Sequence, residues 1–250
     1  MSILWQRDVG STNYQVRQAG NSLRLYTNGV FHSQYNPRRP VTGSVWDLLL
    51  LPAFFYRRGS VRRVLVLGVG GGTVIQQLRR FVKPETIVGV EWSDIHLYIA
   101  ERFFAVRGDD VELVRANAVD WVRAYEGPDF DIIIDDLFGH CDGETQRSVL
   151  ADRMWVSSLA RCLSGEGMIV CNFASSLELM ASAYLNHGSV RRVFKSGFHL
   201  STPQNYNAVG AFIKRPARTR QLRDRLIRIP QLDPRRQSSR LSYNIRTLPL

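Results

Sequence analysis

The sequence predicts an α/β fold built on a mostly parallel sheet, preceded by a small N-terminal β-meander. From Val61 onward, short apolar runs alternate with amphipathic segments, which is the pattern of strands and helices in turn. Before that, residues 12–35 contain short alternating runs separated by the turn dipeptides Gly20-Asn21 and Asn28-Gly29. Alternating strands and helices imply a parallel sheet covered on both faces, with ligands expected at the carboxyl ends of its strands.

The elements follow from these patterns in chain order. The meander strands are TNYQVRQ and SLRLYT, and SVWDLLLLPAFFY (44–56) predicts a connecting helix. Further strands are predicted at 61–68, 86–91, 111–116, 130–137 and 167–173, and helices at 73–81, 94–104, 118–125, 147–163 and 176–185. An antiparallel pair at 193–201 and 207–215 closes the sheet. We therefore divide the chain into an N-terminal β domain (1–42), a ligand-binding domain (43–215) and a tail (216–250).

Composition narrows the classes of protein. No apolar run is long enough to span a bilayer, and the first residues, MSILWQRDVG, lack the features of a signal peptide. The three cysteines have no CxxC spacing, and three loop neighbours such as His140, Cys141 and Asp142 cannot readily surround one ion. We expect a cytoplasmic protein without a membrane span, a disulfide framework or a metal.

The net charge of +11 is concentrated at the end of the chain. Residues 214–250 contain eleven Lys and Arg against two Asp, which accounts for +9 of that charge. The body of the protein is therefore close to neutral. A solvated extension, or one draped over another subunit, is the simpler interpretation. The alternative is a contact with RNA, DNA or an anionic surface.

A glycine-rich bend follows the strand at 61–68. Gly68, Gly70, Gly71 and Gly72 can expose backbone amides at a helix N-terminus and let a ligand approach closely. Dinucleotide enzymes use GxGxxG at such a bend, but Thr73 stands where the third glycine belongs. Alone, the bend is a weak signal of a nucleotide site.

Polar residues at three later strand ends strengthen that signal. Glu91, followed by Trp92, is 21 residues after Gly70, where a carboxylate can accept both ribose hydroxyls. Asn117 can meet the amino edge of adenine, and Ala118 leaves room for the ring. Asp136 ends the next strand. The set resembles the nucleoside pocket of S-adenosylmethionine-dependent transferases more than that of a nicotinamide dehydrogenase.

With these segments in place, the chain resembles the spermidine synthase (polyamine aminopropyltransferase) family from about residue 14 to residue 215. The resemblance rests on the Asn28-Gly29-Val30 turn and on VLVLGVGGGT, IVGVEWSDIHLYIAERFF, VELVRANAVDWV, FDIIIDDLFG and TPQNYNAVGAFIKR. It implies a seven-stranded, mostly parallel sheet of the class I methyltransferase (Rossmann-like) type and a homodimer or higher oligomer. It also implies S-adenosylmethionine, or its decarboxylated form, as the donor, with Glu91 on the ribose.

The chain departs from the family where the substrate amines would bind. Asp136 matches the first Asp of the DxxD-type motif, which in this family helps to deprotonate the attacking amine, but the second acidic position is Gly139. The Asp of GGGDGG, which holds the aminopropyl ammonium, is replaced by Gly71, and the Tyr of Tyr-His-Glu by Val45. Tyr206 corresponds loosely to a late substrate-contacting Tyr and is our second catalytic candidate.

These losses favour methyl transfer. Ammonium groups beside a sulfonium need carboxylates to offset repulsion, whereas a methyl donor keeps its own carboxylate and tolerates Gly71 with an exposed amide. Asp136 is the candidate base, or alternatively a carboxylate that orients ligand or caps a helix. Asp135 is expected to face the other side of the sheet. The loop 137–143, the helix around Trp46 and Tyr206 are expected to line the acceptor pocket.

Two other functions stay open. The first is aminopropyl transfer to a polyamine, and the second is a non-catalytic nucleoside- or RNA-binding module. The acceptor is expected to be a small molecule, possible classes including amines. A nicotinamide-dependent dehydrogenase ranks below both, because of Thr73.

Overall fold

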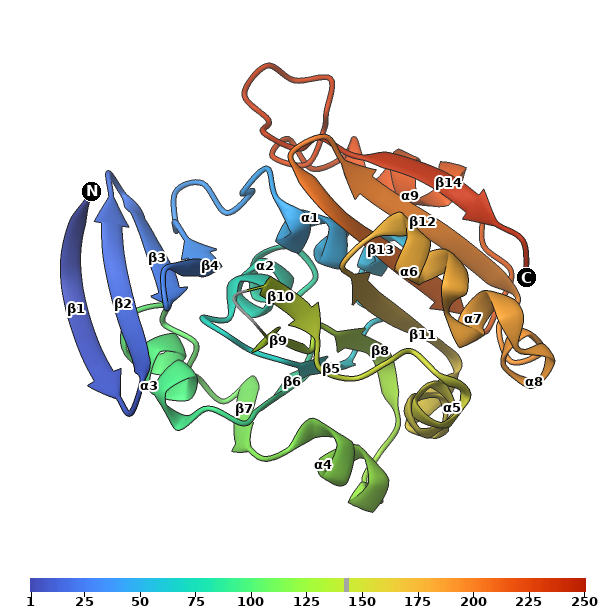
Figure 1. Ribbon diagram of the computed structural model, residues 1–250. Coiled ribbons are helices and arrows are strands. Elements are labelled where there is room, and N and C mark those ends of the chain that lie inside the picture. Colours follow the sequence, from blue (N-terminus) through green and yellow to red (C-terminus); the bar gives the residue numbers. More distant parts are fainter. Residues whose placement is uncertain (142–143) are drawn as a thin grey trace.

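Two β-sheets of unequal size dominate the fold, with helices on both faces of the larger one (Figure 1). The computed structural model describes residues 1–141 and 144–250. Within the described residues, no helix is long and apolar enough to cross a membrane.

The smaller sheet is an antiparallel meander in the order β1-β2-β3-β4. It begins earlier than predicted, because Ser2–Val9 adds an exposed first strand. Asn28 and Gly29 both have positive φ, as the turn dipeptide predicts. Val16 and Leu25 are fully buried and join the meander to the core of the larger sheet. The four strands are β1 (Ser2–Val9), β2 (Thr12–Ala19), β3 (Ser22–Thr27) and β4 (Val30–Tyr35).

The larger sheet has eight strands in the order β14-β12-β13-β11-β8-β5-β6-β7. From β11 to β7 the neighbours are parallel, and β13, β12 and β14 are joined antiparallel. The parallel strands are β5 (Arg63–Leu67), β6 (Thr86–Glu91), β7 (Val111–Arg115), β8 (Phe130–Asp135) and β11 (Leu163–Phe173). The others are β12 (Ser196–Thr202), β13 (Asn205–Ile213) and β14 (Asn244–Leu248). A separate hairpin pairs β9 (Phe138–Cys141) with β10 (Glu144–Arg147).

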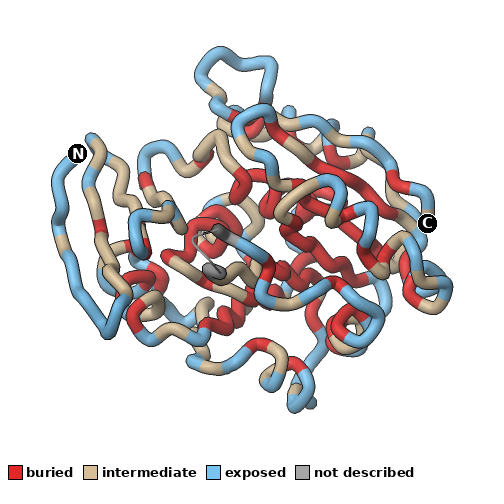
Figure 2. The backbone as a smooth tube through the Cα atoms, in the orientation of Figure 1, coloured by how far each residue is buried: buried red, intermediate tan, exposed pale blue. Residues whose placement is uncertain are grey.

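Alternate residues of each strand pack against different helices. In β5, Val64 and Val66 belong to one apolar cluster, and Leu65 and Leu67 belong to the other. The first cluster includes residues of α1 (Val45–Leu50), η1 (Leu51–Phe55), α2 (Thr73–Phe81), α3 (Asp94–Arg102) and α9 (Thr219–Leu226). The second includes residues of α4 (Ala118–Ala124), α5 (Arg153–Arg161), α6 (Ser176–Ala181), α7 (Ala183–Asn186) and α8 (Gly188–Arg191). The sheet between them is buried along most of its length (Figure 2).

The strand count corrects the prediction of seven. The additional strand is β14, which pairs antiparallel with the edge of β12, from Gly197↔Leu248 to Ser201↔Asn244. Leu222 and Leu226 of α9 are fully buried, as is Leu232 beyond it. The segment expected to be solvated or draped over another subunit therefore packs on its own chain, because its few apolar side chains are buried there.

Three helices differ most from their predicted bounds. The helix expected at 147–163 begins only at Arg153, after Asp152, whose carboxylate caps it by accepting from the Trp155 amide. The helix expected at 176–185 is broken at Ser182 into α6 and α7. The connecting helix tightens into the 3₁₀ turn η1, where Pro52 follows the last α-helical residues.

Candidate functional site

A cavity of about 800 Å³ lies at the carboxyl ends of the parallel strands. Most of the predicted ligand-binding residues line it: Gly68, Gly70, Glu91, Trp92, Asn117, Ala118 and Asp136. Gly71, Gly72 and Tyr206 do not. Trp92 is 77% exposed at the rim of this cavity. The parallel sheet thus brings the glycine bend and the polar residues of three strand ends to a single cavity, as the sequence predicted.

The glycine bend is shaped by close packing on both sides. Gly68 has a φ of +85°, and a Cβ there would strike the backbone of Asp136, where β5 and β8 end side by side. Gly71 is buried, and its amide donates to Ser33 Oγ at 2.8 Å. The prediction that the Gly71 amide is exposed to a bound methyl donor is therefore wrong, because Ser33 of β4 covers this amide.

Glu91 accepts hydrogen bonds from the backbone of the glycine bend. Its Oε2 accepts from the amides of Val69 and Gly70, each at 3.0 Å, and its Oε1 accepts from the Ser93 amide at 3.1 Å. Burial tends to raise the pKa of this carboxyl, but His96 and the backbone amides together lower it below the ordinary value. Glu91 therefore stays ionised inside the site, where it can also accept from ribose hydroxyls.

His96 is a cavity residue that the sequence reasoning missed. Its Nδ1 lies 3.7 Å from Glu91 Oε1, and its Nε2 lies 3.0 Å from Thr27 Oγ1 of the meander. The ring meets Tyr14 edge-on, with centroids 5.6 Å apart. The signal for this residue was its place in α3, directly beyond the strand end that carries Glu91. His96 thus links the meander to the Glu91 carboxylate in the cavity.

Asn117 has a structural duty beside its predicted one. Its Oδ1 caps α4 by accepting from the amides of Val119, at 2.9 Å, and Asp120, at 3.3 Å. The carbonyl oxygen is therefore engaged by the helix. The side-chain amide nitrogen remains the group that can meet a purine, as a donor to a ring nitrogen.

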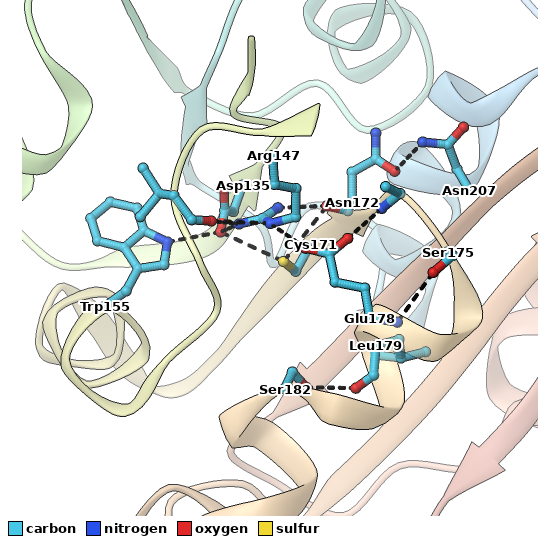
Figure 3. Close-up of polar contacts among 12 residues, drawn as sticks. Asp135, Arg147, Trp155, Cys171, Asn172, Ser175, Glu178, Leu179, Ser182 and Asn207 are labelled. Carbon is cyan, nitrogen blue, oxygen red and sulfur yellow. Dashed lines mark hydrogen bonds and ion pairs between the residues drawn. The ribbon is translucent and has the colours of Figure 1, made fainter. Parts of the chain in front are cut away.

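Asp136 is held by a chain of amides from the neighbouring strands. Asn172 of β11 donates to Asp136 Oδ1 at 2.7 Å, and Asn207 of β13 donates to Asn172 Oδ1 at 3.1 Å. Figure 3 shows Asn207 pointing toward Asn172. Burial raises the pKa of the Asp136 carboxyl to about 6, although the hydrogen bond from Asn172 opposes that rise. Such a carboxylate is ionised at neutral pH and accepts a proton more readily than an ordinary aspartate.

Asp135 faces the opposite side of the sheet, as strand alternation predicts. It is fully buried and pairs with Arg147 of β10 at 2.8 Å, while Trp155 Nε1 donates to the same carboxylate oxygen at 2.9 Å (Figure 3). Arg147 also donates to the Asn172 carbonyl at 2.5 Å. Asp135 therefore belongs to a buried ion pair that fastens the β9–β10 hairpin to the sheet.

Tyr206 is not in the cavity. Its side chain is 97% exposed, whereas Asn205 and Asn207 on either side line the cavity. Successive residues of a strand face opposite ways, so a loosely aligned segment misplaced by one residue selects the wrong face. Tyr206, predicted as a second catalytic residue, therefore lies outside the cavity in this structure, and Asn207 next to it lines the cavity.

Part of the predicted acceptor pocket lies in this cavity. Trp46, Leu137, Phe138 and Gly139 line the cavity, as predicted for the connecting helix and the first part of the loop. Asp142 and Gly143, which were also assigned to this pocket, lie outside the described residues, as do the side chains of His140 and Cys141. Within the described part of the chain, no group of three His, Cys, Asp or Glu side chains is arranged to hold a metal ion.

The charge of the cavity differs from that of the whole chain. Its described lining contains the carboxylates of Glu91, Asp120 and Asp136, and no Lys or Arg. Its other ionisable lining residues are His32 and His96. In a protein of net charge +11, this hollow is locally acidic and favours a cationic ligand.

Sequence comparison finds two related proteins and no matching family model. The chain is 26% identical over 116 residues to a polyamine aminopropyltransferase of Chromobacterium violaceum, which covers 46% of this chain and 43% of that protein. It is 30% identical over 143 residues to a spermine synthase of Arabidopsis thaliana, covering 55% of this chain and 39% of that protein. The matched region thus spans about two fifths of the length of these relatives.

Solved structures extend the likeness to almost the whole chain. A crystal structure of spermidine synthase from Thermotoga maritima matches 91% of this chain and 78% of its own, with a TM-score of 0.67 and 13% identity. A probable spermidine synthase from Corynebacterium glutamicum matches 91% and 88%, with a TM-score of 0.72 and 15% identity. Human methyltransferase-like protein 13, solved with SAH, matches 71% and 86%, with a TM-score of 0.60 and 17% identity. These comparisons confirm the predicted resemblance to the spermidine synthase family and the methyltransferase-like fold.

Proposed function

We propose that this protein is an aminopropyltransferase that uses a decarboxylated S-adenosylmethionine donor and an amine acceptor. The charge of the cavity carries the proposal, since three carboxylates and no Lys or Arg line its described surface. Both substrates of such a reaction are cations, whereas the methyl donor carries a carboxylate that finds no guanidinium or ammonium there. The names of the sequence relatives support the same choice over the methyl transfer that the sequence favoured.

The lining residues divide the work of binding. Glu91, kept ionised among backbone amides, accepts from the ribose hydroxyls. The Asn117 amide and the small Ala118 receive the adenine, with Trp92 at the rim. The bend from Gly68 to Gly70 gives the sulfonium a close approach to the strand ends.

Asp136 performs the proton transfer. The amine arrives as an ammonium and loses a proton to the Asp136 carboxylate, which leaves its lone pair free. That lone pair attacks the methylene carbon on sulfur while the carbon–sulfur bond breaks, and the bonding electrons return to sulfur as a neutral thioether. The protein contributes position and a base, which together are typical of such displacements.

Methyl transfer is the second candidate, favoured by Gly71. In the spermidine synthase family an acid at this position holds the aminopropyl ammonium, and here a Cβ would already lie 2.7 Å from Ser33 Cβ. The meander therefore fills the space that such an acid would occupy. An enzyme of this kind would have to bind the donor amine by other groups, and a methyl donor has no such requirement.

Product analysis tests the proposal. The protein is incubated with the decarboxylated donor and a panel of diamines and polyamines, and products are identified by mass. Growth of the amine by one aminopropyl unit, lost in Asp136→Asn, supports the proposal. A methylated product with S-adenosylmethionine would replace it by the second candidate, and nucleoside binding without any product would indicate a non-catalytic module.

A cytoplasmic location and a homo-oligomeric state are further proposals. Cell fractionation tests the location, and light scattering tests the oligomeric state.

A further inference from the structure

Five arginines gather where η1 meets α9, at the end of the sheet opposite the cavity. Arg57 and Arg58 follow η1, Arg225 lies in the last turn of α9, Arg228 follows that helix, and Arg215 follows β13. We refer to these five residues as the arginine surface. Arg57 and Arg58 come before the first residue of β5. Arg215 comes just after the end of β13, where Ile213 pairs with Met168 of β11. The carboxyl ends of the same parallel strands form the cavity, so the two sites are separate.

Neutral groups hold two of these guanidinium groups in place. Arg225 donates to the Phe54 carbonyl at 2.9 Å, and Arg215 donates to the Phe55 carbonyl at 2.8 Å. The Arg215 guanidinium also lies over the Tyr56 ring, 4.7 Å from its centroid. These contacts order the side chains without neutralising them, which lowers the entropy lost when an anion binds.

The charge of this surface is poorly compensated. Among the described residues, the carboxylate that pairs with it is Glu166, 3.8 Å from Arg215 and itself 79% exposed. Burial, and then the charges of Arg215, Arg57 and Arg228, lower the pKa of the Arg225 guanidinium. The same arginines therefore repel one another in the free protein, and a bound polyanion would relieve that repulsion.

The chemistry of the side chains selects the anion. Ten of the eleven basic residues in 214–250 are arginine, whose planar fork matches phosphate oxygens in two directions. Among the described residues of 214–250, the exposed large apolar side chain is that of Ile227, which is 37% exposed. Insertion into a bilayer needs more apolar surface than this. We propose that the arginine surface binds the phosphodiester backbone of nucleic acid, without reading its sequence.

Fluorescence anisotropy with labelled 20-nucleotide RNA and DNA, single-stranded and duplex, tests the proposal over a range of salt concentrations. The variant is Arg57→Gln/Arg58→Gln/Arg228→Gln, which spares the two arginines that fasten η1. Its matched control is Arg7→Gln/Arg102→Gln/Arg191→Gln, three exposed arginines on β1, α3 and α8 that remove the same charge elsewhere. Thermal melts of both variants verify that each one folds.

The variant should bind single strands on the order of 10- to 100-fold more weakly at 0.1 M salt, with a salt slope smaller by about 2. The control should keep the wild-type slope and most of the affinity, and calorimetry should find nucleoside binding unchanged in both. If the triple variant does not fold, Arg228→Gln alone should reduce the slope by about 0.7. Equal losses in variant and control, absence of nucleic-acid binding by the wild type, or tighter binding to phosphatidylserine vesicles than to nucleic acid would each overturn the proposal.

Discussion

Asp135 and Asp136 are adjacent in the chain, yet their surroundings assign them different tasks. Asp135 is fully buried against Arg147 and Trp155, and Asp136 faces the cavity with Asn172 as its donor. A single step along β8 reverses the face of the sheet, so one carboxylate is buried in an ion pair and the other faces the cavity. The same alternation separates Tyr206, which is exposed, from Asn207, which lines the cavity.

Asp136→Asn should lower kcat by about 10²- to 10⁴-fold, because the amide cannot accept the ammonium proton. Binding of the thioether nucleoside should change little. In the wild type, kcat should fall as pH drops through about 6, where the Asp136 carboxylate becomes protonated. The pH profile of kcat measures this limb, and its persistence in the variant would show that another group is the base.

His96→Ala should weaken binding of 5′-methylthioadenosine, because Glu91 loses the side chain that lies 3.7 Å from its Oε1. The expected loss is about 3- to 30-fold in Kd, from removal of one charge-assisted contact. Tyr98→Ala, on the exposed face of the same helix, is the control. Thr27→Val should give a smaller loss in the same direction. An unchanged Kd in His96→Ala would remove His96 from the site.

Gly71→Ala should destabilise the protein by about 1–3 kcal/mol, since the new Cβ would lie 2.7 Å from Ser33 Cβ and 2.9 Å from Phe104 Cε1. Gly165→Ala is the matched control, because a Cβ there meets no atom within 4 Å. Denaturant unfolding measures both. Equal stability of the two variants would mean that the meander yields at Gly71, and an acid could then be accommodated at that position.

Among the elements, the β9–β10 hairpin depends on one buried side chain. Arg147 ends β10 and reaches Asp135, the Asn172 carbonyl and the Val149 carbonyl. Arg147→Met should destabilise the fold by about 3–5 kcal/mol, because it leaves the Asp135 carboxylate buried without its partner. Asp135→Asn in the same chain should recover part of that loss. A double variant no more stable than the single one would contradict the ion-pair account.

The elements were predictable where their own residues determine them. The strands of the parallel sheet are continuous apolar runs, and Ser93 caps the helix that begins at Asp94. The eighth strand was not predictable in this way, since β14 is a short, mostly exposed segment whose place depends on pairing with β12. The same holds for α9. Its many arginines predicted a solvated segment, although Leu222 and Leu226 are buried.

Across the whole molecule, part of the site followed from sequence and part did not. Gly68, Glu91 and Asp136 stand at strand ends, and a parallel sheet necessarily brings strand ends together. Asn172 and Asn207 enter the site through a tertiary contact between β11 and β13, which no local pattern records, and the contact of His96 with Thr27 of the meander is tertiary as well. The covering of Gly71 by Ser33 likewise depends on how two sheets pack.

Site chemistry also affects the stability of the whole molecule. The pKa of Asp136 is raised from an unfolded value of 3.8 to about 6, so between these values the folded state binds more protons and stability falls as pH rises. Asp136→Asn should therefore be more stable than the wild type by on the order of 1–3 kcal/mol at pH 8. The gain should vanish below about pH 4, where both states carry the protonated acid. Urea unfolding at the two pH values measures it, and a gain independent of pH would contradict the assignment.

The choice between a cationic donor and one with a carboxylate tests the account most directly. Isothermal titration of the wild-type protein with decarboxylated S-adenosylmethionine and with S-adenosylmethionine compares two ligands that differ by that carboxylate alone. The acidic cavity predicts tighter binding of the decarboxylated donor, by about tenfold or more, with the preference reduced in Asp136→Asn. Tighter binding of S-adenosylmethionine would contradict the proposed aminopropyl transfer.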